Sequence, residues 1–386
     1  MADFTIPNRP ALAGALKKAM RQHRAGRLDA AEAGYRRVLT ADPGNANANH
    51  QLGRILTRSK RLKEAFALLR RATKAAPKSA QFLISLSDAC RSAGRVKEEV
   101  AALEAALELA PKQSLILHRL CAALIKLGRY KAVVVAAERA LKLDPSSALS
   151  HNNLGVALQA LDRTEEAERA YRNALEHMPE YPQALSNLGV VLQSTGRKEE
   201  AETSYRRAIE LKPDYMQALG NLAALIQELG RAEEAEEMYR RVIDLSPDYA
   251  EAHNNLGNLL QDQGRLEESL DCYRRTIEIV PKHRLAYNNM ALTLQDQGKL
   301  GEALASLTRQ VELAPDFAEA QSARLRCFNF DPKWSPSEIF TAHREWAAVR
   351  ADKFRPATET HANSRDPARP LRVGYISPDF RVHSVS

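Results

Sequence analysis

The chain has 386 residues, of which 27% are charged and only 6% aromatic, and alanine and leucine are abundant. This composition argues against an ordinary globular protein over most of the length, and it suits many short amphipathic helices packed through small side chains. The net charge of +8 is uneven, because residues 1–130 hold 24 Lys and Arg against 10 Asp and Glu. A basic end of this kind could steer partners, although a solvated helix surface is the simpler interpretation.

The four cysteines, Cys90, Cys121, Cys272 and Cys327, have spacings that fit neither a zinc site nor a redox motif, and they are too few for a disulfide scaffold. We expect them to be buried free thiols in a reducing compartment. The N-terminus lacks the apolar core of a signal peptide, and the chain has no run of 18 apolar residues. The sequence therefore predicts a cytoplasmic protein that does not enter a membrane and has no metal or cofactor site of its own.

After a predicted tail of residues 1–11, residues 12–317 keep one register of 34 residues without insertion. A proline recurs at that spacing, at Pro43, Pro77, Pro111, Pro145, Pro179, Pro213, Pro247, Pro281 and Pro315. A turn position recurs likewise, as Gly26, Lys60, Gly94, Gly128, Asp162, Gly196, Gly230, Gly264 and Gly298. Proline ends a second helix because it lacks an N–H donor, and glycine permits a tight turn between two helices. We expect Lys60 and Asp162 to weaken their two turns.

Small and large residues alternate in the same register. A small residue such as Gly155 or Gly189 stands where a neighbouring helix must approach closely, and a tyrosine such as Tyr171 or Tyr205 is expected to fill the space. Two amphipathic helices cannot bury their apolar faces alone, so neighbouring units must stack. The pattern resembles the tetratricopeptide repeat, which implies an all-α, right-handed superhelical solenoid of about nine repeats.

Packing does not explain one column of asparagines. Five asparagines recur at the 34-residue spacing, each one residue before the apolar position of its repeat: Asn153, Asn187, Asn221, Asn255 and Asn289. Stacked along the inner face, their amides would suit the backbone of an extended peptide, since each offers donors and an acceptor. Asp262 and Asp296, seven residues after their asparagines, would add acidic character to this strip. The alternative is that the asparagines bond across the stack and only hold repeats together.

A second in-phase column contains Gln159, Gln193, Gln227, Gln261 and Gln295. Glutamine is a sound former of exposed helix, so we interpret this column as a solvated face.

The region after the repeats changes character. Residues 318–354 are predicted to form capping helices, with Ser337 as the N-cap of the last one, and residues 355–370 a proline-containing linker. Residues 371–386 begin with LRVGYIS, the first plausible strand, which needs a sheet that this stretch cannot supply. We expect the chain to stop at the start of a truncated α/β domain.

The asparagine column and the C-terminal stretch together resemble bacterial-type protein O-linked N-acetylglucosamine transferases. In that family an asparagine ladder holds extended protein substrates, and a strand followed by a DF-x-x-H segment opens the glycosyltransferase domain. The resemblance implies UDP-GlcNAc as donor, Ser or Thr as acceptor, and a catalytic role for His383. Because the sugar-binding lobes would be missing, this chain alone is expected to be inactive.

The competing hypothesis is a non-enzymatic tetratricopeptide scaffold or co-chaperone adaptor. Some such proteins clamp a carboxylate with Lys, Arg and Asn, and Lys17 and Arg119 could act similarly. We expect partners to be proteins with extended or disordered segments, and not nucleic acid, because the asparagine strip is acidic where it is densest. A homo-oligomer stays open.

Overall fold

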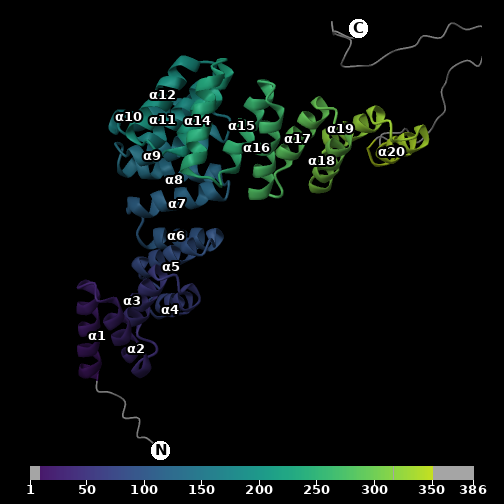
Figure 1. Cartoon of the computed structure of the whole chain (residues 1–386). Helices are drawn as coiled ribbons and strands as arrows, with labels where there is room; N and C mark the ends of the chain where they lie inside the picture. Colours follow the sequence, from purple (N-terminus) through teal and green to yellow (C-terminus); the bar gives the residue numbers. More distant parts are fainter. Residues whose placement is uncertain (1–8, 316, 351–386) are drawn as a thin grey trace, which may run out of the picture. The chain divides into compact units, whose positions relative to one another are not determined.

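The computed structural model describes residues 9–315 and 317–350, and every regular element within them is an α-helix (Figure 1). The helices are α1 (Arg9–Arg24), α2 (Leu28–Ala41), α3 (Ala46–Arg58), α4 (Leu62–Ala75), α5 (Ala80–Ser92), α6 (Val96–Leu109), α7 (Ser114–Lys126), α8 (Tyr130–Leu143), α9 (Ala148–Gln159), α10 (Thr164–His177), α11 (Pro182–Ser194), α12 (Lys198–Leu211), α13 (Met216–Glu228), α14 (Ala232–Leu245), α15 (Ala250–Asp262), α16 (Leu266–Ile279), α17 (Arg284–Asp296), α18 (Leu300–Leu313), α19 (Ala318–Phe330) and α20 (Pro336–Arg350). None of these helices combines the length and apolar character that a membrane-spanning segment requires.

The helix boundaries follow the sequence register. From α3 to α19 the first helix of each pair begins every 34 residues, and from α2 to α18 the second helix does the same. The helix α1 begins at Arg9, three residues before the predicted start of the first repeat. The all-α repeat architecture expected from the proline and turn columns is therefore confirmed.

The turn between the two helices of a pair needs a left-handed residue. Gly196 has φ of +80°, and the next residue, Arg197, donates its N–H to the carbonyl of Leu192 at 2.9 Å, which closes the end of the first helix. Lys60 and Asp162 adopt the same conformation with φ of 58° although they carry a Cβ. Their turns keep the shape of the others, so the cost is local backbone strain and not a different turn.

The small and large columns meet as the sequence predicts. A Cβ added to Gly155 would lie 2.6 Å from the ring of Tyr171, and one added to Gly189 would lie 2.5 Å from the ring of Tyr205. Both tyrosine rings are fully buried. Glycine is therefore required at these two positions because the ring of the second helix occupies the space of a side chain.

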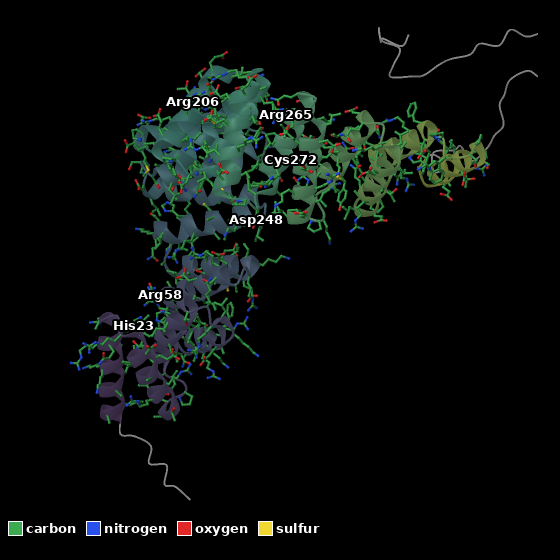
Figure 2. All side chains as sticks on the ribbon, viewed as in Figure 1. His23, Arg58, Arg206, Asp248, Arg265 and Cys272 are labelled. Atoms are coloured by element: carbon green, nitrogen blue, oxygen red, sulfur yellow. The ribbon has the colours of Figure 1, made fainter. Side chains whose placement is uncertain are left out.

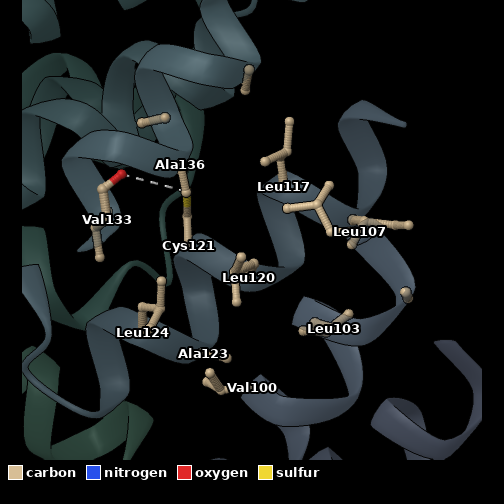
Figure 3. Close-up of a cluster of buried hydrophobic side chains, with 14 of the residues drawn as sticks. Val100, Leu103, Leu107, Leu117, Leu120, Cys121, Ala123, Leu124, Val133 and Ala136 are labelled. Atoms are coloured by element: carbon tan, nitrogen blue, oxygen red, sulfur yellow. Dashed lines mark hydrogen bonds between the residues drawn. The ribbon is translucent and has the colours of Figure 1, made fainter. Parts of the chain in front are cut away.

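The described residues divide into two compact units, with the boundary between Arg265 and Leu266. In the first unit, α1–α15 stack in chain order, and each buries apolar side chains against its neighbours. Figure 3 shows such a cluster around Cys121, whose thiol lies 3.9 Å from the carbonyl oxygen of Val133. Burial raises the pKa of Cys121 to about 12, so this thiol fills space in the core and is not a nucleophile.

The second unit contains α16–α20 among its described residues. Its core joins side chains of α16 to α19, including Leu270, Leu294, Leu307 and Cys327. The helix α19 packs on α18, as the first helix of a further repeat would.

The start of α20 differs from the sequence prediction. Ser335, and not Ser337, caps this helix: its hydroxyl accepts from the N–H of Glu338 at 3.3 Å, and the Glu338 carboxylate accepts from the N–H of Ser335 at 2.8 Å. The prediction of Ser337 is wrong because Pro336 favours the first helical position, which moves the cap one residue before it. The predicted linker (355–370), the strand and His383 lie outside the described residues.

Candidate peptide-binding face

The predicted asparagines all lie on first helices, one each on α9, α11, α13, α15 and α17. Asn153 has an exposed fraction of 7%, whereas the other four are half-buried at the edge of the packed surface. Asn153, Asn187, Asn221 and Asn255 belong to the first unit, and Asn289 belongs to the second. We therefore describe the first four as one set, the asparagine column of the first unit.

One member of this column bonds across the stack. The side-chain amide of Asn187 donates to the side-chain oxygen Oδ1 of Asn152, in the preceding pair, at 3.0 Å. The same two positions are linked earlier in the chain, where His50 Nε2 lies 2.8 Å from Ser85 Oγ. A residue just before the column in one pair thus contacts the column in the next pair.

The other members do not make that bond; the neighbours of Asn153 and Asn255 show why, whereas Ser186 stands in the corresponding place for Asn221 and forms no such bond. His118, which precedes Asn153 by 35 residues, instead lies 2.8 Å from Ser150 Oγ. Gly220 stands in the corresponding place for Asn255 and has no side chain to offer. Within the described residues, the side-chain amides of Asn153 and Asn221 have no hydrogen-bond partner. The purely structural alternative therefore accounts for Asn187 but not for these two.

Asn255 and Asn289 each have a local contact. The side chain of Asn254 donates to the side-chain oxygen Oδ1 of Asn255 at 3.3 Å, and that of Asn288 donates to Oδ1 of Asn289 at 3.4 Å. These bonds orient the two amides, because a carbonyl that accepts from its neighbour turns its NH₂ group the opposite way.

The glutamine column has a different role from the one we predicted. Buried tyrosines donate their hydroxyls to it: Tyr171 to Gln159 at 2.9 Å, Tyr205 to Gln193 at 3.1 Å and Tyr239 to Gln227 at 3.3 Å. The interpretation as a solvated face is wrong for these three glutamines. Burial raises the pKa of Tyr239 to about 12, so its hydroxyl stays a donor at neutral pH.

The same glutamines reach the acidic positions of the following pair. Gln193 donates to Glu228 at 2.9 Å, and Gln227 donates to Asp262 at 3.3 Å. Asp262 is exposed on the first unit and Asp296 on the second. Tyr205, Gln193 and Glu228 therefore form one chain of hydrogen bonds. Tyr239, Gln227 and Asp262 form another, and each chain links one pair to the next and fixes where its carboxylate lies.

The residues proposed for a carboxylate clamp are not equivalent. Arg119 already donates to Asp88 at 3.0 Å, and Lys17 is exposed on α1. The engaged guanidinium of Arg119 leaves the clamp without one of its two cations. Sequence reasoning also missed His50, His118 and Asn152, although their shared phase just before the asparagine column was a readable signal.

Comparisons with known proteins identify the same repeats. Family models described as tetratricopeptide repeat match residues 22–88, 65–114, 146–214, 214–282 and 248–316. The chain is built of tetratricopeptide repeats. Among solved structures, the Cut9–Hcn1 hetero-tetramer of the APC/C contains a chain that aligns over 88% of this one and 73% of its own length, with a TM-score of 0.53 and 16% identity, which shows the shared fold.

The curated relatives that match part of this chain are plant proteins. A protein of Arabidopsis thaliana named probable UDP-N-acetylglucosamine–peptide N-acetylglucosaminyltransferase SPINDLY is 39% identical over 71 residues, which are 18% of this chain and 8% of that protein. Its namesake from Solanum lycopersicum is 38% identical over the same shares. The match thus spans about 8% of the relatives' length, and the bacterial type that we expected stays a prediction.

Proposed function

We propose that this chain is a protein-binding repeat domain that holds extended protein segments along the asparagine column of its first unit. The observation that carries this proposal is the pair of amides at Asn153 and Asn221, which have no hydrogen-bond partner in the described residues. These amides have no protein partner to give up, so a peptide backbone that replaces water on one of them gains about 0.5–1.5 kcal/mol of binding free energy.

The finer proposal places the domain in an O-GlcNAc transferase-like protein. Support comes from the partial similarity to proteins named for peptide N-acetylglucosaminyl transfer and from the resemblance of residues 371–386 to the start of that catalytic domain. In this proposal the repeats present Ser or Thr of a bound segment to a domain that uses UDP-GlcNAc, and His383 belongs to that domain.

Binding is tested with an unstructured, fluorescently labelled peptide rich in Ser, Thr and Gly. We expect Asn221→Ala to weaken binding by about tenfold, the equivalent of one lost hydrogen bond, and the double variant Asn221→Ala/Asn255→Ala to weaken it further. Asn173→Ala is the matched control, because Asn173 is exposed on the second helix α10. Equal affinity of all four proteins for the peptide would overturn the proposal.

The transferase part has a separate test. Residues 1–386, incubated with UDP-GlcNAc and an acceptor protein, are expected to transfer no sugar, because residues 371–386 resemble only the opening stretch of that catalytic domain. Glycosylated acceptor in a mass spectrum would contradict the proposed dependence on further catalytic sequence.

A further inference from the structure

Two adjoining hollows lie on the first three helix pairs, far along the chain from the asparagine column. The first, of about 290 Å³, is lined by Met20, His23, Arg24, Tyr35, Gln51 and Arg54. The second, of about 430 Å³, includes Arg54, Arg58, Lys60, Ser85 and Asp88 in its lining. Arg54 lines both, so the two hollows form one continuous surface on α1, α3 and α5. Figure 2 shows His23 and Arg58 on these N-terminal helices.

The cations of this surface lack carboxylate partners. Arg24, Arg54 and Arg58 make no ion pair within the described residues, and Arg54 donates only to the neutral side chain of Gln51, at 3.2 Å. Arg36 on the second helix α2 is paired, since it lies 2.6 Å from Glu64 and 2.8 Å from Glu32. Within the described residues, Arg37 and Arg71 on second helices make no ion pair either, so what distinguishes Arg24, Arg54 and Arg58 is that they line the two hollows.

The one acid in the lining does not neutralise them. Asp88 pairs with Arg91 and also accepts from Arg119 at 3.0 Å. With Asp88 already shared by two guanidinium groups, Arg24, Arg54, Arg58 and Lys60 leave the surface strongly positive.

Two neighbouring histidines have pKa values lowered by burial and by these positive charges. The charges of Arg54 and Arg58 add to burial in lowering the pKa of His23, and Arg54 adds to burial in lowering the pKa of His50 to about 4. Both histidines are therefore neutral at pH 7, and the arginines carry the charge of the surface.

The surface suits carboxylates better than nucleic acid. Single-stranded nucleic acid is held by base stacking on exposed aromatic rings, and Tyr35, the one aromatic ring of the two linings apart from His23, is fully buried. Arginine forks, in contrast, match carboxylates through paired hydrogen bonds. Gln51 and Ser85 hold the same repeat position as the later asparagines, so an amide and a hydroxyl lie beside the cations.

We propose that the joined hollows of α1, α3 and α5 bind an acidic segment of a partner protein, with Arg54 and Arg58 pairing its Asp and Glu carboxylates. This site is separate from the asparagine column and recognises side-chain charge, whereas the column recognises backbone.

The test uses the full chain and a labelled, unstructured Glu-rich peptide, with its Gln-for-Glu counterpart as a reference. Arg54→Gln/Arg58→Gln is expected to weaken binding of the Glu peptide by about tenfold or more, since it removes two charged hydrogen-bond donors to carboxylates. Arg37→Gln/Arg71→Gln removes the same charge from exposed positions of the second helices, outside both hollows, and should change affinity by less than about twofold. Because Arg54 is half-buried, Arg24→Gln/Arg58→Gln provides a second variant at exposed positions.

Three results would overturn the proposal. The first is equal weakening by the hollow and control variants, which would indicate unspecific charge attraction. The second is equal affinity for the Glu and Gln peptides. The third is tighter binding of single-stranded oligouridine than of the Glu peptide, which would assign the surface to nucleic acid. Asn221→Ala should leave binding of the Glu peptide unchanged, so failure here and failure of the proposed function are distinguishable.

Discussion

At the scale of single residues, whether a helix position requires glycine depends on the atoms that lie against it. Gly189 lies against the ring of Tyr205, whereas an added Cβ at Gly220, also inside a first helix, would have no atom within 4 Å. The two glycines share a helix type but differ in their neighbours, so the same substitution should have opposite effects on stability.

We expect Gly189→Ala to lower the free energy of unfolding by about 1–3 kcal/mol, because the methyl group forces Tyr205 out of its place. Gly220→Ala should raise it by about 0.5–1 kcal/mol through helix propensity. Urea unfolding followed by circular dichroism measures both. Destabilisation of similar size in both variants would show that the close approach at Gly189 is not what requires glycine.

His50 links stability to pH. Burial, with the charge of Arg54, lowers its pKa from 6.5 to about 4. Between these values the unfolded chain binds a proton that the folded chain does not, so the histidine's contribution is fully present above pH 6.5 and is lost as pH falls toward 4.

His50→Gln should therefore reduce the loss of stability between pH 7 and pH 4.5 by up to about 3 kcal/mol relative to the wild type. The surface variant His253→Gln is the control, because His253 makes only an exposed contact with the carbonyl of Pro247. The comparison uses urea unfolding at both pH values. The same pH dependence in His50→Gln as in the wild type would rule out His50 as its source.

At the scale of helices and turns, the sequence register accounts for most of what forms. Pro and the left-handed turn position set where each helix ends, and the helices begin at the predicted 34-residue interval. What the register could not show is how far side chains reach. The tyrosine-to-glutamine bonds join residues 12 positions apart across a turn, and no periodicity reveals such a contact.

Lys60 and Asp162 test the cost of the left-handed turn. Replacing either with glycine should stabilise the first unit by about 0.5–1 kcal/mol, because the strain of a Cβ at φ of 58° exceeds the added entropy of the unfolded chain. Thermal unfolding of Lys60→Gly against Lys63→Gly, a substitution inside α4, separates relief of strain from the ordinary cost of glycine in a helix. A lower melting temperature in both variants would contradict the claim that Lys60 is strained in the left-handed conformation.

At the scale of the whole molecule, the repeat architecture was predictable, whereas the sites were only partly so. The asparagine column is visible in the sequence. The sequence does not show that Asn187 bonds to the preceding helix pair whereas Asn221 does not, because that depends on side-chain contacts between neighbouring pairs. The hollows around Arg54 were not predictable in detail, because three helices separated by 34-residue steps bring their cations together. The charge imbalance of residues 1–130 was the one sequence signal that pointed to that end.

The asparagine column and the hollows around Arg54 differ in the chemical groups that they would recognise. The later repeats offer amides, which pair with the backbone of any extended segment, and the first repeats offer guanidinium groups, which select acidic side chains. A partner that contains both an acidic stretch and an extended stretch could engage both.

The central claim, that asparagine amides hold a peptide backbone, is tested most directly by exchanging peptide bonds of the bound segment for esters. An ester keeps the shape of the chain but removes one N–H donor and weakens the adjacent carbonyl as an acceptor, so it disrupts backbone hydrogen bonding at a single position. The measurement is a double-mutant cycle between each ester position and Asn221→Ala. We predict that at least one ester weakens binding to the wild type by about tenfold and has little further effect on Asn221→Ala. If every ester peptide bound the wild type as tightly as the amide peptide did, the asparagine column would not be a backbone-binding site.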